Sequence, residues 1–210
     1  MLNQEDNALF TQVGPGTPMG EMLRRYWQPV QCTEFVTGKP QRLKILGENL
    51  VAFRDTDGRV GILERQCPHR LADMWFGRNE NNGLTCAYHG WAYDPAGKIV
   101  DVKEHDAGKY SQAFDSANHD LEPLPNLASY NGIIFGSLSR NVPPLDEYLG
   151  EIRFFLDLVI LSTSSGSFGV PLILQGFCGA GLVLLHVLLA DAAVLGFVAR
   201  HVPVKQERRG

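Results

Sequence analysis

The chain has 210 residues, a formal net charge of −4, and 44% hydrophobic and 20% charged residues. This composition is typical of a globular protein and excludes an intrinsically disordered chain. The mildly acidic balance, with a sequence pI of about 5.8, lacks the basic footprint of a nucleic-acid-binding protein, so no nucleic-acid partner is expected.

The N-terminal stretch MLNQEDNALFTQVGPG has no basic segment followed by a long apolar run, so no secretory signal is predicted. Of the four cysteines, Cys67 and Cys86 lie near histidines, which favours a metal site over a disulfide framework. Together these observations predict a reducing compartment, most simply the cytoplasm. Cys32 and Cys178 have no such neighbours and are interpreted as small buried residues.

A short helix is expected near the N-terminus. Thr17 can cap it, Pro18 suits its first position, and apolar residues recur at helical spacing as far as Tyr26. From residue 41 the pattern changes to short β-prone runs at 42–46, 50–54 and 60–64. An Asp57-Gly58 pair predicts a hairpin turn between the last two.

Further strands are expected on both sides of the turn at 94–97 and after Asn131-Gly132. Many short strands with closely spaced turns indicate an antiparallel β domain that ends near Leu145. A helix is expected over residues 145–159. Its apolar face would hold Leu145, Leu149, Ile152, Leu156 and Val159. The predicted fold class is therefore mainly β, with a short N-terminal helix and a partly helical or irregular C-terminal segment.

The C-terminal composition is different. Residues 158–190 contain no Asp, Glu, Lys or Arg, so the segment is long enough to consider as a membrane span. Its hydropathy is weak, however, and Asp191 in the same apolar stretch would be expensive in lipid. A buried or poorly formed segment is the preferred interpretation, and membrane insertion is not expected.

Two short clusters carry the chemistry of the sequence, in the pattern Cys67-x-His69-x16-Cys86-x2-His89. Zinc fingers usually pair Cys with Cys and His with His within one loop, whereas each cluster here has one of each. This arrangement suits a two-iron cluster in which the Cys pair binds one iron and the His pair binds the other. A structural Cys2His2 zinc site is the alternative.

Redox chemistry supports the iron interpretation. Two neutral imidazoles in place of two thiolates raise the potential of a 2Fe–2S cluster from about −400 mV to about −150 to +300 mV. Pro68 would stiffen the first loop, and Gly90 would allow a tight turn beside the second histidine. Tyr88 and Trp91 would shield the sulfurs from water. An ordinary aromatic core is the alternative role for these two rings.

The motifs CPHR and YHGW at this spacing resemble the Rieske 2Fe–2S domain. The flanking residues are similar to the large (alpha) subunits of bacterial Rieske non-haem iron ring-hydroxylating oxygenases. GPGTPMGEMLRRYWQPV and FGRNE resemble the phthalate dioxygenase-like branch, and YNGIIFGSLSRNVPPLDEYLGE resembles the naphthalene dioxygenase-like branch. The resemblance covers roughly residues 10–158.

This resemblance implies a Rieske domain with an N-terminal helical extension over residues 1–157. Residues 158–210 would be a degenerate or truncated start of the catalytic domain. The implied cofactor is a Rieske-type 2Fe–2S cluster held by Cys67, His69, Cys86 and His89. The implied partners are a reductase or ferredoxin electron donor, within a homotrimer or an alpha–beta assembly, and the implied substrate is an aromatic or related ring compound.

The family's second metal, a mononuclear Fe(II) in a D-x2-H-x4-H motif completed by a distal Asp, is not supported by this sequence. If His186 is placed on the first His, Val183 replaces the Asp and Asp191 replaces the second His. In the other register, Ala180, Val183 and Leu188 occupy the three positions. His186 is therefore interpreted as a core histidine, and no catalytic residue is assigned.

Two functional alternatives stay open beside an oxygenase component. One is a stand-alone Rieske ferredoxin-like carrier with an apolar tail, and the other is a structural zinc module. No dinucleotide fingerprint, P-loop or nucleophile elbow is present in the sequence, so electrons from NAD(P)H would need a separate protein. The chain alone is expected to transfer electrons, and whether it is itself an enzyme is left open. The remaining histidines are interpreted as loop or exposed residues: His105, His119 and His201.

Overall fold

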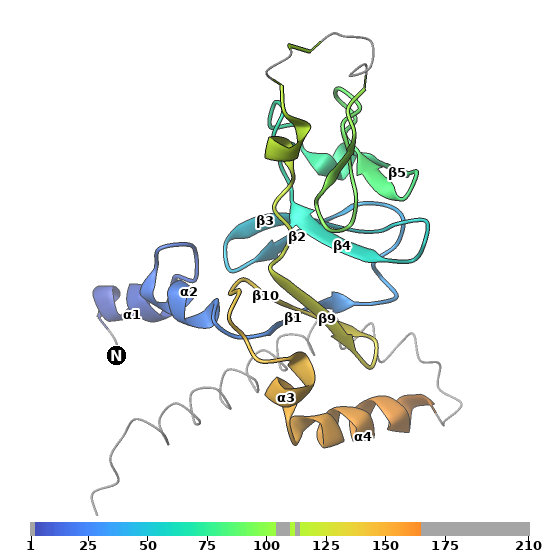
Figure 1. The fold of residues 1–210 in the computed structure, drawn as a ribbon. Coiled ribbons are helices and arrows are strands. Elements are labelled where there is room, and N and C mark those ends of the chain that lie inside the picture. Colours follow the sequence, from blue (N-terminus) through green and yellow to red (C-terminus); the bar gives the residue numbers. More distant parts are fainter. Residues whose placement is uncertain (1–2, 104–109, 112–113, 165–210) are drawn as a thin grey trace, which may run out of the picture. The chain divides into compact units, whose positions relative to one another are not determined.

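The computed structural model describes residues 3–103, 110–111 and 114–164. The chain divides between residues 148 and 149 into two units. The first unit holds three antiparallel sheets and two N-terminal helices (Figure 1). The mainly β fold class is thus confirmed.

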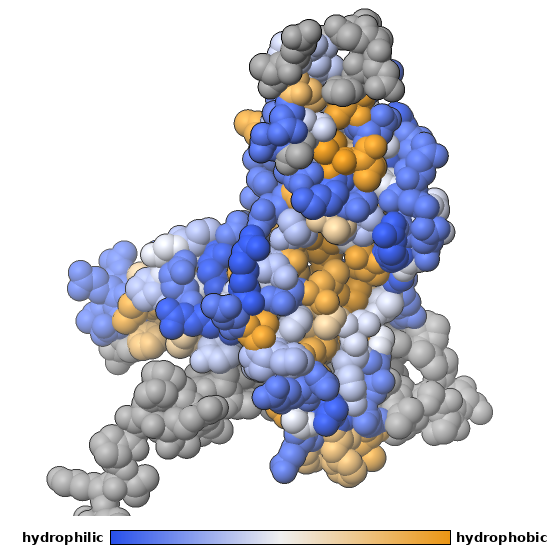
Figure 2. Space-filling model, in the orientation of Figure 1, coloured by the Kyte–Doolittle hydropathy of each residue, from blue (hydrophilic) through white to orange (hydrophobic). Residues whose placement is uncertain are grey.

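Two short helices precede the sheets. Helix α2 (Pro18–Leu23) begins as expected, because the Thr17 side chain accepts a hydrogen bond from the Gly20 backbone N–H. It ends at Leu23, so Tyr26 lies outside it, contrary to the expected helical periodicity. Helix α1 (Gln4–Thr11) was not predicted; it has no buried residue and is capped by the side chain of Asn3. Figure 2 shows mainly hydrophilic residues over this part of the surface.

The central sheet has the order β2-β3-β4, formed by β2 (Gln41–Ile45), β3 (Glu48–Arg54) and β4 (Val60–Glu64). All three strands match the predicted runs. The turn before β4 contains Gly58 at φ +85°, a left-handed conformation that favours glycine.

A second sheet has the order β1-β10-β9, with β1 (Gln28–Cys32), β9 (Asn126–Tyr130) and β10 (Ile133–Ser137). The strand predicted after Asn131-Gly132 is β10. Both turn residues have positive φ, +44° and +81°, and they join β9 to β10 as a tight hairpin. Strands β1 and β9 were not predicted.

The third sheet has the order β5-β6-β7-β8 and carries the predicted metal-binding region. Its strands are β5 (Arg78–Glu80), β6 (Gly83–Thr85), β7 (Ala92–Tyr93) and β8 (Ile99–Asp101). The turn between β7 and β8 is the predicted one. The β5–β6 hairpin was missed, although Asn81 and Asn82, both at positive φ, are residues that such a turn favours.

Strand β3 explains how the core is organised. Val51 and Phe53 pack into a cluster with Trp91 and Tyr93 beside the third sheet. Leu50 and Ala52, on the opposite face, pack into a second cluster with Ile62, Leu124 and Ile134. Because both faces of β3 are buried at its middle, residues 50–53 form a continuous apolar run with no polar alternation.

The single helix expected over 145–159 is two helices, α3 (Leu145–Leu149) and α4 (Ile152–Ser164). Gly150, at φ +47°, interrupts the helical backbone between them. In the described residues no helix is both long and apolar enough to cross a membrane. The apolar segment from residue 165 onward lies outside the described residues, so the predicted domain boundary at 157/158 stays a prediction.

Candidate metal centre

The two Cys/His clusters form two loops with the same hydrogen-bonded closure. In the first, the Cys67 N–H donates to the Ala72 carbonyl (2.9 Å) and the Leu71 N–H donates to the Cys67 carbonyl (2.8 Å). In the second, the Cys86 N–H donates to the Trp91 carbonyl (2.7 Å) and the Gly90 N–H donates to the Cys86 carbonyl (3.0 Å). Each loop therefore returns on itself immediately after its cysteine.

This closure requires a left-handed residue four positions after each cysteine. Gly90 adopts φ +75°, as its predicted role in a tight turn requires, and a Cβ there would lie 3.0 Å from the Lys103 Cδ. The equivalent residue in the first loop is Leu71, at φ +55°. A leucine in this region is uncommon, and its side chain is 66% exposed.

The two cysteines are buried and adjacent. Cys67 is 1% exposed and Cys86 is 3% exposed. A hydrogen bond between the two side chains lowers the pKa of the Cys86 thiol to about 6 and, together with burial, raises that of Cys67. The lowered pKa of Cys86 favours its thiolate, which is the form that binds metal. The Tyr93 hydroxyl lies 3.4 Å from the Cys67 Sγ.

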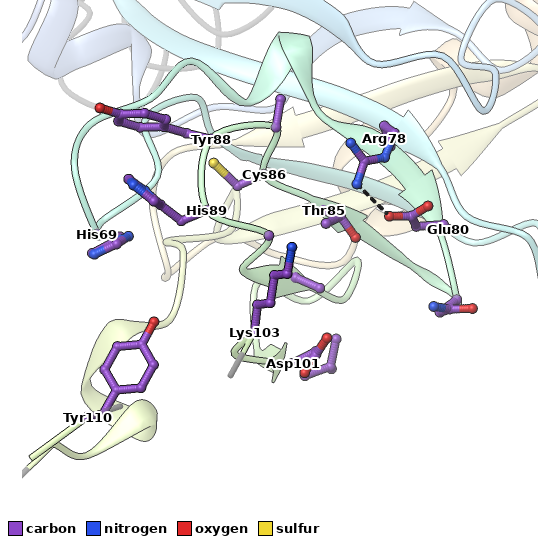
Figure 3. A pocket seen from close by; sticks show the side chains of 15 residues that line it. His69, Arg78, Glu80, Thr85, Cys86, Tyr88, His89, Asp101, Lys103 and Tyr110 are labelled. Carbon is purple, nitrogen blue, oxygen red and sulfur yellow. Dashed lines mark hydrogen bonds and ion pairs between the residues drawn. The ribbon is translucent and has the colours of Figure 1, made fainter. Parts of the chain in front are cut away.

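The two histidines lie beside each other nearer the surface. Their ring centroids are 4.6 Å apart and the rings meet edge to face. Figure 3 shows His69 and His89 coming from separate loops toward one region, with Cys86 near His89. Burial, followed by the charges of His89 and Arg70, lowers the pKa of His69 and favours the neutral imidazole that binds metal. The structure thus brings all four predicted residues together, the cysteines inside and the histidines outside.

The aromatic neighbours differ from the prediction in one respect. Trp91 is 1% exposed and stacks on His69, with ring centroids 4.4 Å apart and ring planes 5° apart. Tyr88 is 62% exposed and lies beside His89, so its expected role in shielding the sulfurs is wrong. Tyr93, which contacts a sulfur directly, was missed. The sequence offered one signal for it. Tyr93 is two positions after Trp91, so the two side chains lie on the same side of an extended chain.

A pocket of about 790 Å³ opens at this end of the domain (Figure 3). Its lining includes the Arg78–Glu80 ion pair (3.2 Å), whose side chains are largely exposed. The other lining residues come mainly from the second loop and from β8: His69, Asn81, Thr85, Cys86, Ala87, Tyr88, His89, Gly90, Ala92, Val100, Asp101, Lys103 and Tyr110.

His119 has closer contacts than a solvated loop histidine. Its ring meets the Trp91 ring edge to face at 5.4 Å, and its Nδ1 lies 2.9 Å from the Asp115 carbonyl oxygen. Cys32 is buried at 2% exposure, as expected, but its thiol is not free, so it is more than a small buried residue. The other predictions fall outside the described residues; they concern His105, Cys178, Ala180, Val183, His186, Leu188, Asp191 and His201.

The donor set tests what kind of metal group would fit. Within the described ranges, no three His, Cys, Asp or Glu side chains converge as ligands of a single ion would. The four residues instead form a thiol pair and an imidazole pair. Two pairs suit a group with two metal atoms better than one tetrahedral zinc ion.

The part of the chain that contains the two loops is similar to a known domain. The family model described as the Rieske [2Fe-2S] domain matches residues 26–130. The chain is similar to the phthalate 4,5-dioxygenase oxygenase subunit of Pseudomonas putida, with 50% identity over 105 residues, 49% of this chain and 24% of that protein. It is also similar to the 5,5'-dehydrodivanillate O-demethylase oxygenase subunit of Sphingobium sp., with 49% identity over 132 residues, 60% of this chain and 31% of that protein.

Among solved structures, naphthalene 1,2-dioxygenase from Rhodococcus sp. bound to indole matches with a TM-score of 0.55 and 27% identity. The match covers 68% of this chain and 34% of that one. The chain therefore spans only about a quarter to a third of the length of these relatives.

Proposed function

The chain belongs to the Rieske [2Fe-2S] domain family, and on that basis we propose that Cys67 and Cys86 bind one iron of the cluster while His69 and His89 bind the other. The observation that carries this proposal is the arrangement of the two loops. Each loop contributes one residue to the buried thiol pair and one to the outer imidazole pair. A two-iron cluster needs this division of ligands, whereas a zinc ion does not.

The protein groups around the ligands favour a bound cluster. The burial of both cysteines keeps water from the sulfurs, and the Tyr93 hydroxyl can donate a hydrogen bond to a metal-bound Cys67 Sγ. Backbone N–H groups of His69, Tyr88 and His89 also point at the two sulfurs. When bound, such a cluster accepts and releases one electron. The two histidines are partly exposed, so they would be the part of the site that lies nearest to an electron-transfer partner.

We further propose that the chain is the electron-transfer part of an oxygenase large subunit acting on an aromatic or related ring compound. The names of the similar proteins, including dioxygenase oxygenase subunits, support this class. A reductase or ferredoxin would supply the electrons, in the cytoplasm, and the subunit would assemble as a homotrimer or with a beta subunit. A stand-alone ferredoxin-like carrier is less well supported, because the resemblance includes α2 and the segment leading into α3.

We propose that the electrons pass toward a mononuclear iron whose family motif this sequence does not match. His186 and Asp191 offer two ligands at most, because Val183 stands where the family has an Asp. Residues 158–210 are proposed to be a degenerate or truncated start of the catalytic domain, following a Rieske domain over 1–157.

An electron-transfer assay tests the function. The purified chain is reduced anaerobically with dithionite or with a ring-hydroxylating reductase and then exposed to air with phthalate or naphthalene. We expect rapid reduction of the cluster and slow reoxidation, without a hydroxylated product. Failure to accept an electron refutes the electron-transfer role. Substrate-dependent oxygen consumption with diol formation would mean that the chain does hold a second iron site, contrary to the proposal.

A further inference from the structure

The two proposed histidine ligands have different surroundings. The His69 ring lies parallel to the Trp91 indole, at 4.4 Å and 5°. Among the described residues, the ring contacts of His89 are with His69 and with the exposed Tyr88 ring, which is tilted by 38°. One ligand is therefore covered by a buried, parallel ring, and the other lies beside a ring that is 62% exposed.

The indole that covers His69 is itself held in place. Its Nε1–H donates a hydrogen bond to the Tyr110 hydroxyl at 3.0 Å. The Phe114 ring meets it edge to face at 5.6 Å, and the His119 ring does so at 5.4 Å. With an exposure of 1%, Trp91 has no room to rotate away from His69.

Trp91 also links the two loops. It closes the second loop, because its carbonyl accepts the Cys86 N–H at 2.7 Å, yet its ring contacts the histidine of the first loop. A movement of either loop would therefore change the stack. This contact joins the loops through side chains rather than through backbone hydrogen bonds.

We propose that Trp91 is a positioning residue that fixes the plane of the His69 ring, with Tyr110 fixing the plane of Trp91 in turn. The inference rests on the proposed function, since the ring orientation matters because His69 would bind the outer iron. A parallel indole at 4.4 Å permits the imidazole little tilt and excludes water from one of its faces. Residues outside the ligand set tune a metal centre in this way, by orienting the ligands and controlling access of water.

The test compares Trp91→Leu, Trp91→Phe and Tyr110→Phe in the full chain carrying its cluster. Trp75→Leu is the matched control, because Trp75 is a partly buried tryptophan whose ring contacts are with Phe76 and Arg42. Two readouts are made after iron analysis: the midpoint potential, and the hyperfine coupling of the histidine nitrogens in the reduced cluster.

We expect Trp91→Leu to raise the potential, because water reaching His69 stabilises the extra negative charge of the reduced cluster. We also expect the His69 nitrogen coupling to broaden, because the ring then samples several orientations. Trp91→Phe keeps a ring that can stack on His69, so its midpoint potential and nitrogen coupling should stay close to those of the wild type. Tyr110→Phe should change both properties in the same direction as Trp91→Leu, but less. If Trp91→Leu does not retain the cluster, the potentials and couplings of Trp91→Phe and Tyr110→Phe are compared with those of Trp75→Leu instead.

Changes no larger than those of Trp75→Leu in both readouts would overturn the proposal. If the wild-type chain binds no iron, the proposed function has failed, and the stack is tested separately. In that diamagnetic protein, an upfield ring-current shift of the His69 ring-proton NMR signals that disappears in Trp91→Leu supports the positioning role. Absence of this shift in the wild type overturns the positioning role.

Discussion

The Tyr93 hydroxyl lies 3.4 Å from the Cys67 Sγ, and both groups are buried beneath the two loops. Tyr93 follows the second loop on β7, whereas Cys67 begins the first loop. Burial and the hydrogen bond with Cys67 raise the pKa of Tyr93, so the phenol keeps its proton. Tyr93 would therefore remain a hydrogen-bond donor to a metal-bound Cys67 Sγ.

Tyr93→Phe should lower the reduction potential of the cluster. The hydrogen bond stabilises the reduced form more than the oxidised form, because negative charge on the sulfur increases on reduction. For a differential of about 1 kcal/mol the shift is on the order of 40 mV. Protein-film voltammetry on both proteins measures it. Tyr88→Phe is the control, because the Tyr88 ring is exposed and lies beside His89. Equal potentials for Tyr93→Phe and wild type would contradict the predicted role.

Gly97→Ala should be far more destabilising than Gly58→Ala. Both glycines turn a hairpin at nearly the same φ, +82° and +85°. A Cβ at Gly97 would lie 2.1 Å from the Leu121 carbonyl oxygen, whereas a Cβ at Gly58 would have nothing within 4 Å. We expect a loss in the free energy of unfolding of about 1 kcal/mol for Gly58→Ala. For Gly97→Ala we expect about 3 kcal/mol or more. Urea denaturation that gives equal losses would contradict the packing of the β7–β8 turn against Leu121.

Asp120 should make the stability of the third sheet depend on pH. Hydrogen bonds from the Lys98 Nζ (2.6 Å) and the Ile99 N–H (2.9 Å) lower the pKa of its carboxyl group. A lowered folded-state pKa gives a stabilisation that is present above the unfolded value of about 4 and is lost as pH falls through the folded value. We expect Asp120→Asn to lose about 0.5–1 kcal/mol at neutral pH, since the pair is partly exposed.

Urea unfolding at several pH values measures this contribution. The difference between wild type and Asp120→Asn should shrink toward zero as the solution is made acidic. Asp57→Asn serves as the comparison, because Asp57 is 58% exposed and lies 4.0 Å from Arg59. A difference that stays constant with pH would mean that the Asp120 contacts do not stabilise the folded state.

Much of this structure was predictable where a local signal exists. The Asp57-Gly58 and Asn131-Gly132 turns, the Thr17 cap and the three central strands follow from residue preferences that act over a few positions. Strand β1 was missed, because it pairs with β10, about a hundred residues away in the chain. Propensity within a short window carries no information about such a partner.

In the candidate site, too, local features were predictable and contacts between separate loops were not. One Cys and one His in each cluster were enough to predict which residues meet, because ligand spacing is a local property. The surroundings were less predictable, since Trp91 contacts His69 and Tyr93 contacts Cys67 across two loops. Tyr88, adjacent in sequence to His89, was expected to be inside, but the tight turn at Gly90 leaves it exposed.

Metal and sulfide analysis of the anaerobically purified chain tests the central claim most directly. We expect a red-brown protein with about two irons and two acid-labile sulfides per chain, whose reduced form shows coupling to two histidine nitrogens. His69→Cys and His89→Cys should each remove one of these couplings and lower the potential, whereas His105→Ala should leave both in place. A colourless protein with one zinc ion and no sulfide would contradict the assignment of Cys67, His69, Cys86 and His89 as ligands of a Rieske cluster.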